Sequence, residues 1–96
     1  ANDGDRSIFS FTRHSENGKN NLLFVCNFTP VARPDYRVGT TCRRKHTLIL
    51  NSDAAEFGGS GKKRPEVYKP VKKPCDDRKY SIAYDLPAYG VAIFKY

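Results

Sequence analysis

Hydrophobic and polar residues along this chain fall into short apolar runs separated by polar turns. Residues 8–13 and 22–29 flank a polar stretch that contains Asn17-Gly18, a dipeptide typical of tight β-hairpin turns. The run at 22–29 is apolar at most positions on both faces, which is typical of a central strand. These features predict a hairpin whose second strand lies inside a sheet.

The clearest alternation lies near the C-terminus. Every second residue from 80 to 86 is large and apolar, as expected of a strand that buries one face. The residues predicted to share this buried face are Tyr80, Ile82, Tyr84 and Leu86. Pro87-Ala88 predicts a turn into a last strand at 89–96.

The middle of the chain gives weaker strand signals. Residues 35–39, which follow Pro34, predict a short edge strand, and residues 45–51 predict another strand. A further short edge strand is predicted at 66–71, inside a segment rich in Lys, Arg and Pro. One helical turn is predicted at 53–56. No longer window has helical periodicity, so the pattern predicts an all-β sandwich.

The length of 96 residues allows one domain with one core, without a second lobe around a deep active site. No apolar run approaches the roughly 18 residues that a membrane span needs, so we expect no membrane contact. The three cysteines, with no leader pattern at the N-terminus, predict reduced thiols in a cytoplasmic protein. We expect Cys26 to be a core residue and Cys42 and Cys75 to be exposed.

The formal charge of +7 is concentrated in residues 33–79, which hold 13 basic and six acidic side chains. Such a segment could attract nucleic acid or another polyanion. The other interpretation is a set of solvated loops. We favour the solvated loops, because charge alone is a weak signal and the basic residues are not interleaved with aromatic ones.

Catalytic and metal-binding patterns are weak. Cys42 and His46 have a spacing that some metal sites use, but no second pair accompanies them. The glycines at 58–61 precede Lys62-Lys63 without the other residues of a phosphate-binding loop, so we interpret them as a flexible loop. Asp76-Asp77 are adjacent and point in different directions on an extended chain. We therefore expect no catalytic residue, no metal and no cofactor.

Four ordered blocks of the sequence resemble the C-terminal region of bacterial glycogen branching enzymes. They cover nearly the whole chain. The blocks are residues 5–13, residues 25–39 with Val-Cys-Asn-Phe-Thr-Pro-Val at 25–31, residues 49–61, and residues 80–90.

The resemblance implies a 1,4-α-glucan branching enzyme of family 13 of the glycoside hydrolases, which cleaves an α-1,4 glucan and re-attaches it as an α-1,6 branch. It implies an antiparallel Greek-key β-sandwich of two sheets, as in the C-terminal domain of alpha-amylase family enzymes. Residues 1–96 would form that single domain, with residues 1–6 as a tail from the preceding barrel. The barrel's catalytic Asp and Glu have no matching segment here. The chain would be a non-catalytic accessory domain in glycogen biosynthesis, and its main partner would be that barrel.

The alternative hypothesis is an independent basic β module that binds a polyanion such as nucleic acid. Contact with α-glucan is a separate question. A sugar ring docks on exposed aromatic side chains flanked by hydrogen-bonding groups, because it has an apolar side and polar edges. The candidate residues for glucan or barrel contact are Tyr36, Arg37, Asp53, Phe57, Gly58, Gly59 and Tyr68. We favour core or barrel packing for Tyr36 and Phe57, since aromatic residues in small domains are usually core.

Overall fold

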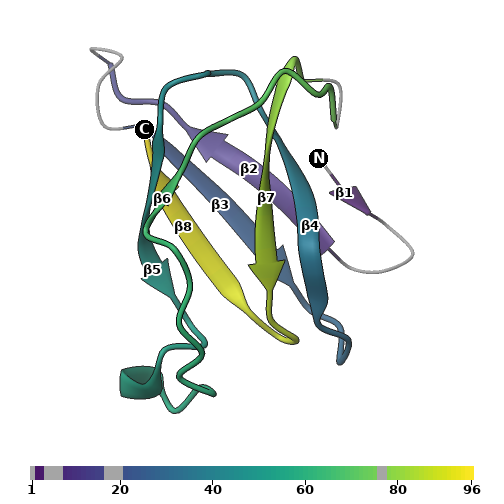
Figure 1. Cartoon of the computed structure of the whole chain (residues 1–96), viewed down its shortest axis with the longest axis vertical. Coiled ribbons are helices and arrows are strands. Elements are labelled where there is room, and N and C mark those ends of the chain that lie inside the picture. The colour runs from purple at the N-terminus through teal and green to yellow at the C-terminus, as the bar shows by residue number, and fades with distance from the viewer. Residues whose placement is uncertain (1, 4–7, 17–20, 76–77) are drawn as a thin grey trace.

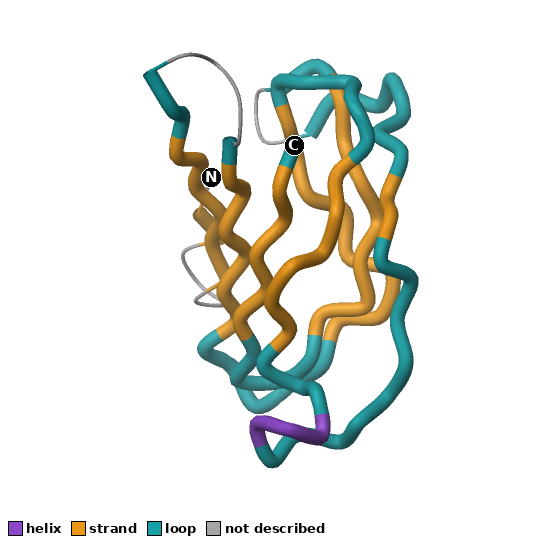
Figure 2. The backbone as a smooth tube through the Cα atoms, turned by 90° about the vertical axis from the view of Figure 1, so that its left-hand side faces the viewer, coloured by secondary structure: helices purple, strands orange, loops and turns teal. Residues whose placement is uncertain are grey.

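The computed structural model describes residues 2–3, 8–16, 21–75 and 78–96. In these residues two antiparallel sheets face each other, as Figures 1 and 2 show. The larger sheet has the strand order β1-β2-β3-β8-β5-β6, and the smaller sheet pairs β4 with β7. The elements are β1 (Asn2–Asp3), β2 (Ile8–Arg13), β3 (Leu22–Asn27), β4 (Arg33–Thr40), β5 (His46–Asn51), the 3-10 helix η2 (Ala55–Phe57), β6 (Val67–Tyr68), β7 (Tyr80–Leu86) and β8 (Val91–Lys95).

The two-sheet architecture confirms the predicted antiparallel β-sandwich. β8 is last in the sequence but lies between β3 and β5, the kind of non-sequential order that Greek-key connections produce. β7 and β8 belong to opposite sheets, so the turn at Pro87-Ala88 is an arch across the sandwich. Gly90 is needed there, because a Cβ at this position would lie 2.3 Å from the Cγ of Pro87.

The predicted hairpin is confirmed by the pairing of β2 with β3, and β3 is a central strand of its sheet. The Asn17-Gly18 turn and Asp76-Asp77 lie outside the described residues. Of the predicted tail at residues 1–6, only Asn2–Asp3 are described, and they pair with β2. The helical turn predicted at 53–56 appears as η2, and the predicted strand at 66–71 is shortened to β6.

The core lies between the sheets. Ile82, Tyr84 and Leu86 of β7 are buried as predicted, and Tyr80 is half-buried. Ser81, on the opposite side of the strand, is also buried, because Val71 pairs with it through two backbone hydrogen bonds.

Asn27 joins two turns at one end of the sandwich. Its side chain is fully buried, and its amide nitrogen donates to the carbonyls of Val31 and Pro87, both at 3.0 Å. Its amide oxygen accepts from the backbone N–H of Thr29 at 2.9 Å. A buried amide with all these partners fixes the exit of β3 relative to the arch before β8.

The structure corrects the expected exposure of two thiols. Cys26 is buried as predicted, and its burial raises the pKa of the thiol. Cys42 and Cys75 are only partly exposed. Cys42 packs against the core cluster, and the Cys75 Sγ lies 3.6 Å from the carbonyl oxygen of Arg37. The polar sequence around both residues does not reveal these contacts.

Candidate functional site

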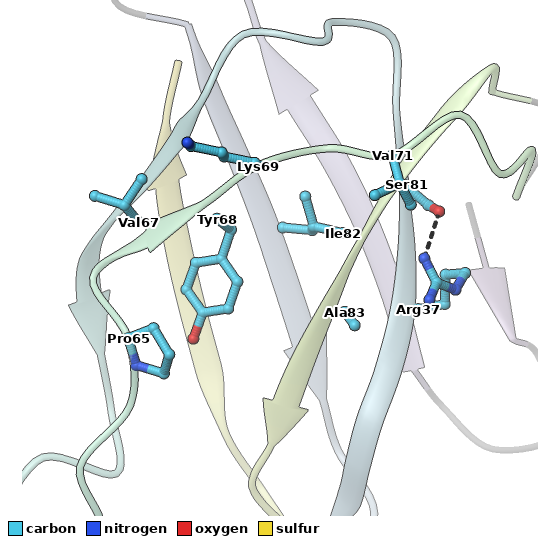
Figure 3. Close-up of a pocket in the computed structure, with 9 residues that line it drawn as sticks. All are labelled: Arg37, Pro65, Val67, Tyr68, Lys69, Val71, Ser81, Ile82 and Ala83. Carbon is cyan, nitrogen blue, oxygen red and sulfur yellow. Dashed lines mark hydrogen bonds between the residues drawn. The ribbon is translucent and has the colours of Figure 1, made fainter.

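A pocket of about 270 Å³ lies between the segment at 65–71 and β7. Figure 3 shows its lining, which comes from both sheets. The lining residues are Arg37, Pro65, Val67, Tyr68, Lys69, Val71, Ser81, Ile82 and Ala83.

The pocket exists because residues 66–71 cross from one sheet to the other. At one end the carbonyl of Glu66 accepts from the N–H of Leu48 in β5, at 2.6 Å. At the other end Val71 pairs with Ser81 of β7 at 2.9 and 3.0 Å. The segment therefore covers the side of the core that the two-stranded sheet leaves open, and the pocket lies under this cover.

Tyr68 forms the aromatic part of the lining. Its ring meets those of Tyr84 and Phe94 edge to face, with centroids 5.7 and 5.3 Å away. Burial raises the pKa of Tyr68, so the phenol is neutral and can donate a hydrogen bond. The ring is held rigidly by the core while part of it remains exposed to the pocket.

Arg37 supplies the polar part. It lies on β4 opposite Ala83, and its Nη1 donates to the hydroxyl of Ser81 at 2.9 Å. This bond, drawn in Figure 3, holds the guanidinium beside the pocket. Lys69 adds a second positive charge at the exposed rim.

The lining is suited to binding, and its groups that can transfer a proton are the Tyr68 phenol and the Lys69 ammonium. Among the nine described residues that line the pocket, none carries a carboxylate, an imidazole or a thiol. An aromatic ring, apolar walls and hydrogen-bond donors suit a small polar ligand with an apolar side.

The sequence candidates separate into two regions. Arg37 and Tyr68 come together in the pocket, whereas Tyr36, on the next position of β4, packs against the core cluster. Phe57 is 60% exposed in the loop that follows β5, where Figure 1 shows the short helix η2 at the bottom of the view. The glycines of the predicted set, Gly58 and Gly59, lie in that same loop.

Asp53 organises this loop. Its carboxylate accepts from the amide and the hydroxyl of Ser60, at 2.9 and 2.5 Å, and from Nη1 of Arg64 at 2.8 Å. Gly59 passes so close that a Cβ would lie 2.3 Å from the Asp53 carbonyl group. The Ser60 hydroxyl and amide, followed by Arg64, lower the pKa of Asp53 from 3.8 to about 2. Asp53 is therefore ionised at neutral pH, and its carboxylate holds the loop together.

Arg64 is the residue that sequence reasoning missed. Its side chain is 4% exposed, its Nε donates to the Asp85 carbonyl at 2.7 Å, and its guanidinium lies 5.8 Å from the ring centroid of Tyr84. The expectation of solvated loops over residues 33–79 is wrong at this position. No sequence signal distinguishes Arg64 from Lys62 and Lys63, its exposed basic neighbours.

His46, which shares a possible metal-site spacing with Cys42, is a buried core residue in the structure. His46 is fully buried, and its Nδ1–H donates to the carbonyl of Arg44 at 2.8 Å. Its Nε2 lies 2.9 Å from the hydroxyl of Thr40, and its ring stacks on Tyr96 at 4.3 Å. Burial is the main cause that lowers the pKa of His46, so the imidazole is neutral at pH 7. Both of its nitrogens have hydrogen-bond partners. In the described residues no group of three or more potential metal ligands occurs.

Comparison with known proteins identifies one family and several named relatives. The family described as the alpha amylase C-terminal all-beta domain matches residues 1–96. The 1,4-alpha-glucan branching enzyme GlgB of Butyrivibrio fibrisolvens is 46% identical over 98% of this chain, and that of Halothermothrix orenii is 37% identical over 97%. The protein of that name from Bacillus cereus is 35% identical over 99%.

The chain spans only 15% of the length of each of these three relatives. In the described part of the chain, no helix combines the length and apolar character needed to cross a membrane. The resemblance to branching enzymes seen in the sequence is confirmed, and these relatives do not support the polyanion-binding alternative. Since the family match covers residues 1–96, the chain belongs to the alpha amylase C-terminal all-beta domain family.

Proposed function

We propose that this chain is the non-catalytic C-terminal domain of a 1,4-α-glucan branching enzyme, with residues 1–96 forming one accessory module. The observation that carries the proposal is that relatives named as such enzymes match nearly all of this chain over 15% of their own length. The longer polypeptide, here called the parent, cleaves α-1,4 glucan and re-attaches it as an α-1,6 branch. Its catalytic barrel is the domain's main partner. The three free thiols agree with a cytoplasmic parent.

The arrangement of carboxylates supports a non-catalytic role. Glycoside chemistry uses two carboxyl groups on either side of a sugar bond, one of them protonated. The guanidinium of Arg64 pairs with both Asp53 and Asp85, through Nη1 and Nη2. A carboxyl group with a pKa of about 2 does not supply a proton at neutral pH.

The experiment compares the 96-residue chain with the parent on amylose. Iodine absorbance and the chain-length profile after debranching are measured at equal molar concentrations. The parent should lower the iodine colour and create new branches, and the isolated chain should match a blank without protein. A parent without branching activity would refute the proposed enzyme. Activity of the isolated chain that persists through further purification would refute the non-catalytic role.

The proposal includes contact with α-glucan at one place only, the pocket beside Tyr68. The pocket beside Tyr68 is favoured over the loop that carries Phe57, because it combines an aromatic ring with the Arg37 guanidinium and the Lys69 ammonium. Its volume of about 270 Å³ lies below the range of roughly 300–1,000 Å³ that is typical of larger ligands. The pocket would therefore hold one glucosyl unit at the end of a chain.

Titration of the 96-residue chain with maltoheptaose, followed through amide signals, tests this contact. Millimolar sugar should shift Lys69, Val71 and Ala83 and leave residues around Phe57 unchanged. Shifts confined to Phe57 and its neighbours would move the contact to the loop. If neither region responds, the domain does not bind glucan, and the accessory role is unaffected.

A further inference from the structure

The pocket beside Tyr68 carries positive charge that a neutral sugar does not need. Two of its lining residues, Arg37 and Lys69, are cations, and none of the nine carries a carboxylate. In the described residues the ion pairs lie around Arg64, and neither Arg37 nor Lys69 takes part in one. The charge of the pocket is therefore available to a ligand.

The two carboxylates of the smaller sheet do not neutralise this charge. Asp85 lies two positions after Ala83 on β7, and its carboxylate pairs with Nη2 of Arg64 at 3.9 Å. Asp35, two positions before Arg37, lies in the irregular part of β4 with a φ of 57°. Among the described residues Asp35 forms no ion pair.

The guanidinium of Arg37 is held in place with most of its donors unused. A guanidinium has five N–H donors in a planar fork. Among the described residues the Arg37 side chain makes one hydrogen bond, from Nη1 to the hydroxyl of Ser81 at 2.9 Å. A guanidinium fixed in this way is preorganised to donate two parallel hydrogen bonds to the oxygens of a phosphate or a carboxylate.

The charge and the aromatic ring lie on different sides of the pocket. Figure 3 shows Tyr68 to one side of Ala83 and Arg37, with its bond to Ser81, to the other. The ring of Tyr68 is held edge to face against that of Tyr84, with centroids 5.7 Å apart. The arrangement suits a ligand with an apolar side at one end and an acidic group at the other.

The size and charge of the pocket narrow the acidic group. A volume of about 270 Å³ admits one sugar unit with a small substituent. A phosphate monoester carries about −1.5 to −2 charges at neutral pH and three strong acceptor oxygens, whereas a carboxylate carries one charge. Two cations, Arg37 in the wall and Lys69 on the exposed rim, match the phosphate.

We propose that this pocket selects a hexose that carries a phosphate monoester. The sugar ring lies against Tyr68, and the phosphate accepts hydrogen bonds from the guanidinium of Arg37. The sugar part of this assignment rests on the proposed function, and the phosphate is new. The same chemistry occurs in a free hexose phosphate and in a phosphorylated glucosyl unit at the end of a glucan.

Titrations of the 96-residue chain with glucose 6-phosphate, glucose and inorganic phosphate test the selection. The amide signals of Ser81 and Ala83 report binding. Glucose 6-phosphate should bind about tenfold or more tightly than either of the others, because it alone makes both the ring contact and the charged hydrogen bonds. Equal affinities for glucose 6-phosphate and glucose would overturn the role of the charge. Equal affinities for glucose 6-phosphate and inorganic phosphate would overturn the role of the sugar ring.

A second series identifies the source of the phosphate. It compares glucose 6-phosphate with maltoheptaose and with maltoheptaose that is phosphorylated on its non-reducing terminal unit. Tighter binding of the phosphorylated chain would indicate a modified glucan end, and tighter binding of glucose 6-phosphate would indicate a free metabolite. If phosphorylation does not raise the affinity of maltoheptaose and glucose 6-phosphate binds no better than glucose, the proposal fails.

A matched pair of variants places the phosphate. Arg37→Gln removes the charge from the pocket, and Arg43→Gln removes one from an exposed position that does not line it. Arg37→Gln should weaken binding of glucose 6-phosphate about tenfold, while Arg43→Gln should change it less than about twofold. Arg37→Lys, which keeps the charge without the fork, should recover part of the loss. Equal effects of Arg37→Gln and Arg43→Gln would overturn the assignment. If Arg37→Gln does not fold, the ligand series on the unmodified chain decides.

Branching activity of the parent separates the two proposals. A parent that branches amylose, with a domain that binds glucose and glucose 6-phosphate equally, refutes only the phosphate selection. A parent that does not branch amylose, with a domain that selects glucose 6-phosphate, refutes only the proposed enzyme.

Discussion

The two outer faces of this sandwich are built from different side chains, although both sheets bury one shared core. The larger sheet presents an outer surface made of Phe9, Phe11, Phe24, Phe28, Leu50 and Ile93, here called the aromatic face, where the rings of Phe11 and Phe24 stack. The smaller sheet presents Arg37 opposite Ala83, with Ser81 and Asp85 along the same side of β7. One outer face is therefore apolar and continuous, whereas the other is polar, carries charges and borders a pocket.

The difference shows that the shared core does not determine the character of the outer residues. The core needs only one apolar side from each sheet, and the smaller sheet shows that the other side can be polar. The predictions that follow probe each side of this contrast.

The largest expected effect separates the core from the aromatic face. Phe94 is fully buried in contact with Tyr84 and Tyr68, so Phe94→Ala should lower the free energy of unfolding of the 96-residue chain by about 3–5 kcal/mol. Phe24 is half-buried on the outer face, and Phe24→Ala should cost about 1 kcal/mol. Urea denaturation measures both values. Equal losses would mean that the aromatic face is part of the stabilising core of the isolated chain.

The next effect concerns the polar side, which depends on a buried charge. Arg64→Ala removes a guanidinium that is 4% exposed and leaves Asp53 with fewer partners, so it should destabilise the chain by about 3 kcal/mol. Lys63→Ala, one position earlier and exposed, should stay within about 0.5 kcal/mol. The same urea titrations compare them. If the two substitutions have similar costs, Arg64 contributes no more than a surface charge.

Arg64 also shows where sequence reasoning ends. The alternation at 80–86 predicted the buried side of β7, because a strand buried on one face has an apolar residue at every second position. The apolar run at 22–29 predicted a central strand, because a strand buried on both faces is apolar throughout. Basic residues carry no such period. Whether a given Arg pairs with a distant Asp85 depends on how loops cross the sandwich.

For the candidate site too, the sequence predicted the residue types but not which residues come together. Tyr36, Arg37 and Tyr68 all satisfied the chemical description of a sugar contact. Only the crossing of residues 66–71 between the sheets brought Arg37 and Tyr68 into one pocket. Likewise, the aromatic face requires the strand order β2-β3-β8-β5, and β8 is separated from β3 by more than sixty residues. Long-range register of this kind is not encoded in any local window.

A smaller effect should appear in acid. The hydrogen bonds from Ser60 and the charge of Arg64 lower the pKa of Asp53 to about 2 in the folded chain, below the ordinary value of 3.8. As pH falls below about 4, the unfolded chain takes up this proton first, so the stability from ionised Asp53 is present above that pH and lost toward pH 2. Asp53→Asn should be less stable at pH 6, and its midpoint of thermal unfolding should fall less between pH 5 and 2. Parallel curves for the two proteins would exclude Asp53 as a source of the acid sensitivity.

The smallest effect concerns the pocket itself and leaves the fold unchanged. Ala83 lines the pocket from β7 and is partly exposed, so Ala83→Leu fills space without removing a hydrogen bond. We expect the affinity for maltoheptaose to fall about tenfold, because the added side chain occupies the volume beside Tyr68, while stability changes by less than about 0.5 kcal/mol. The matched control is Ala32→Leu, at an exposed position that does not line the pocket. Amide titrations of both variants give the affinities. Equal affinities would place any sugar contact elsewhere, and the polar outer face would then be a solvated surface without a ligand.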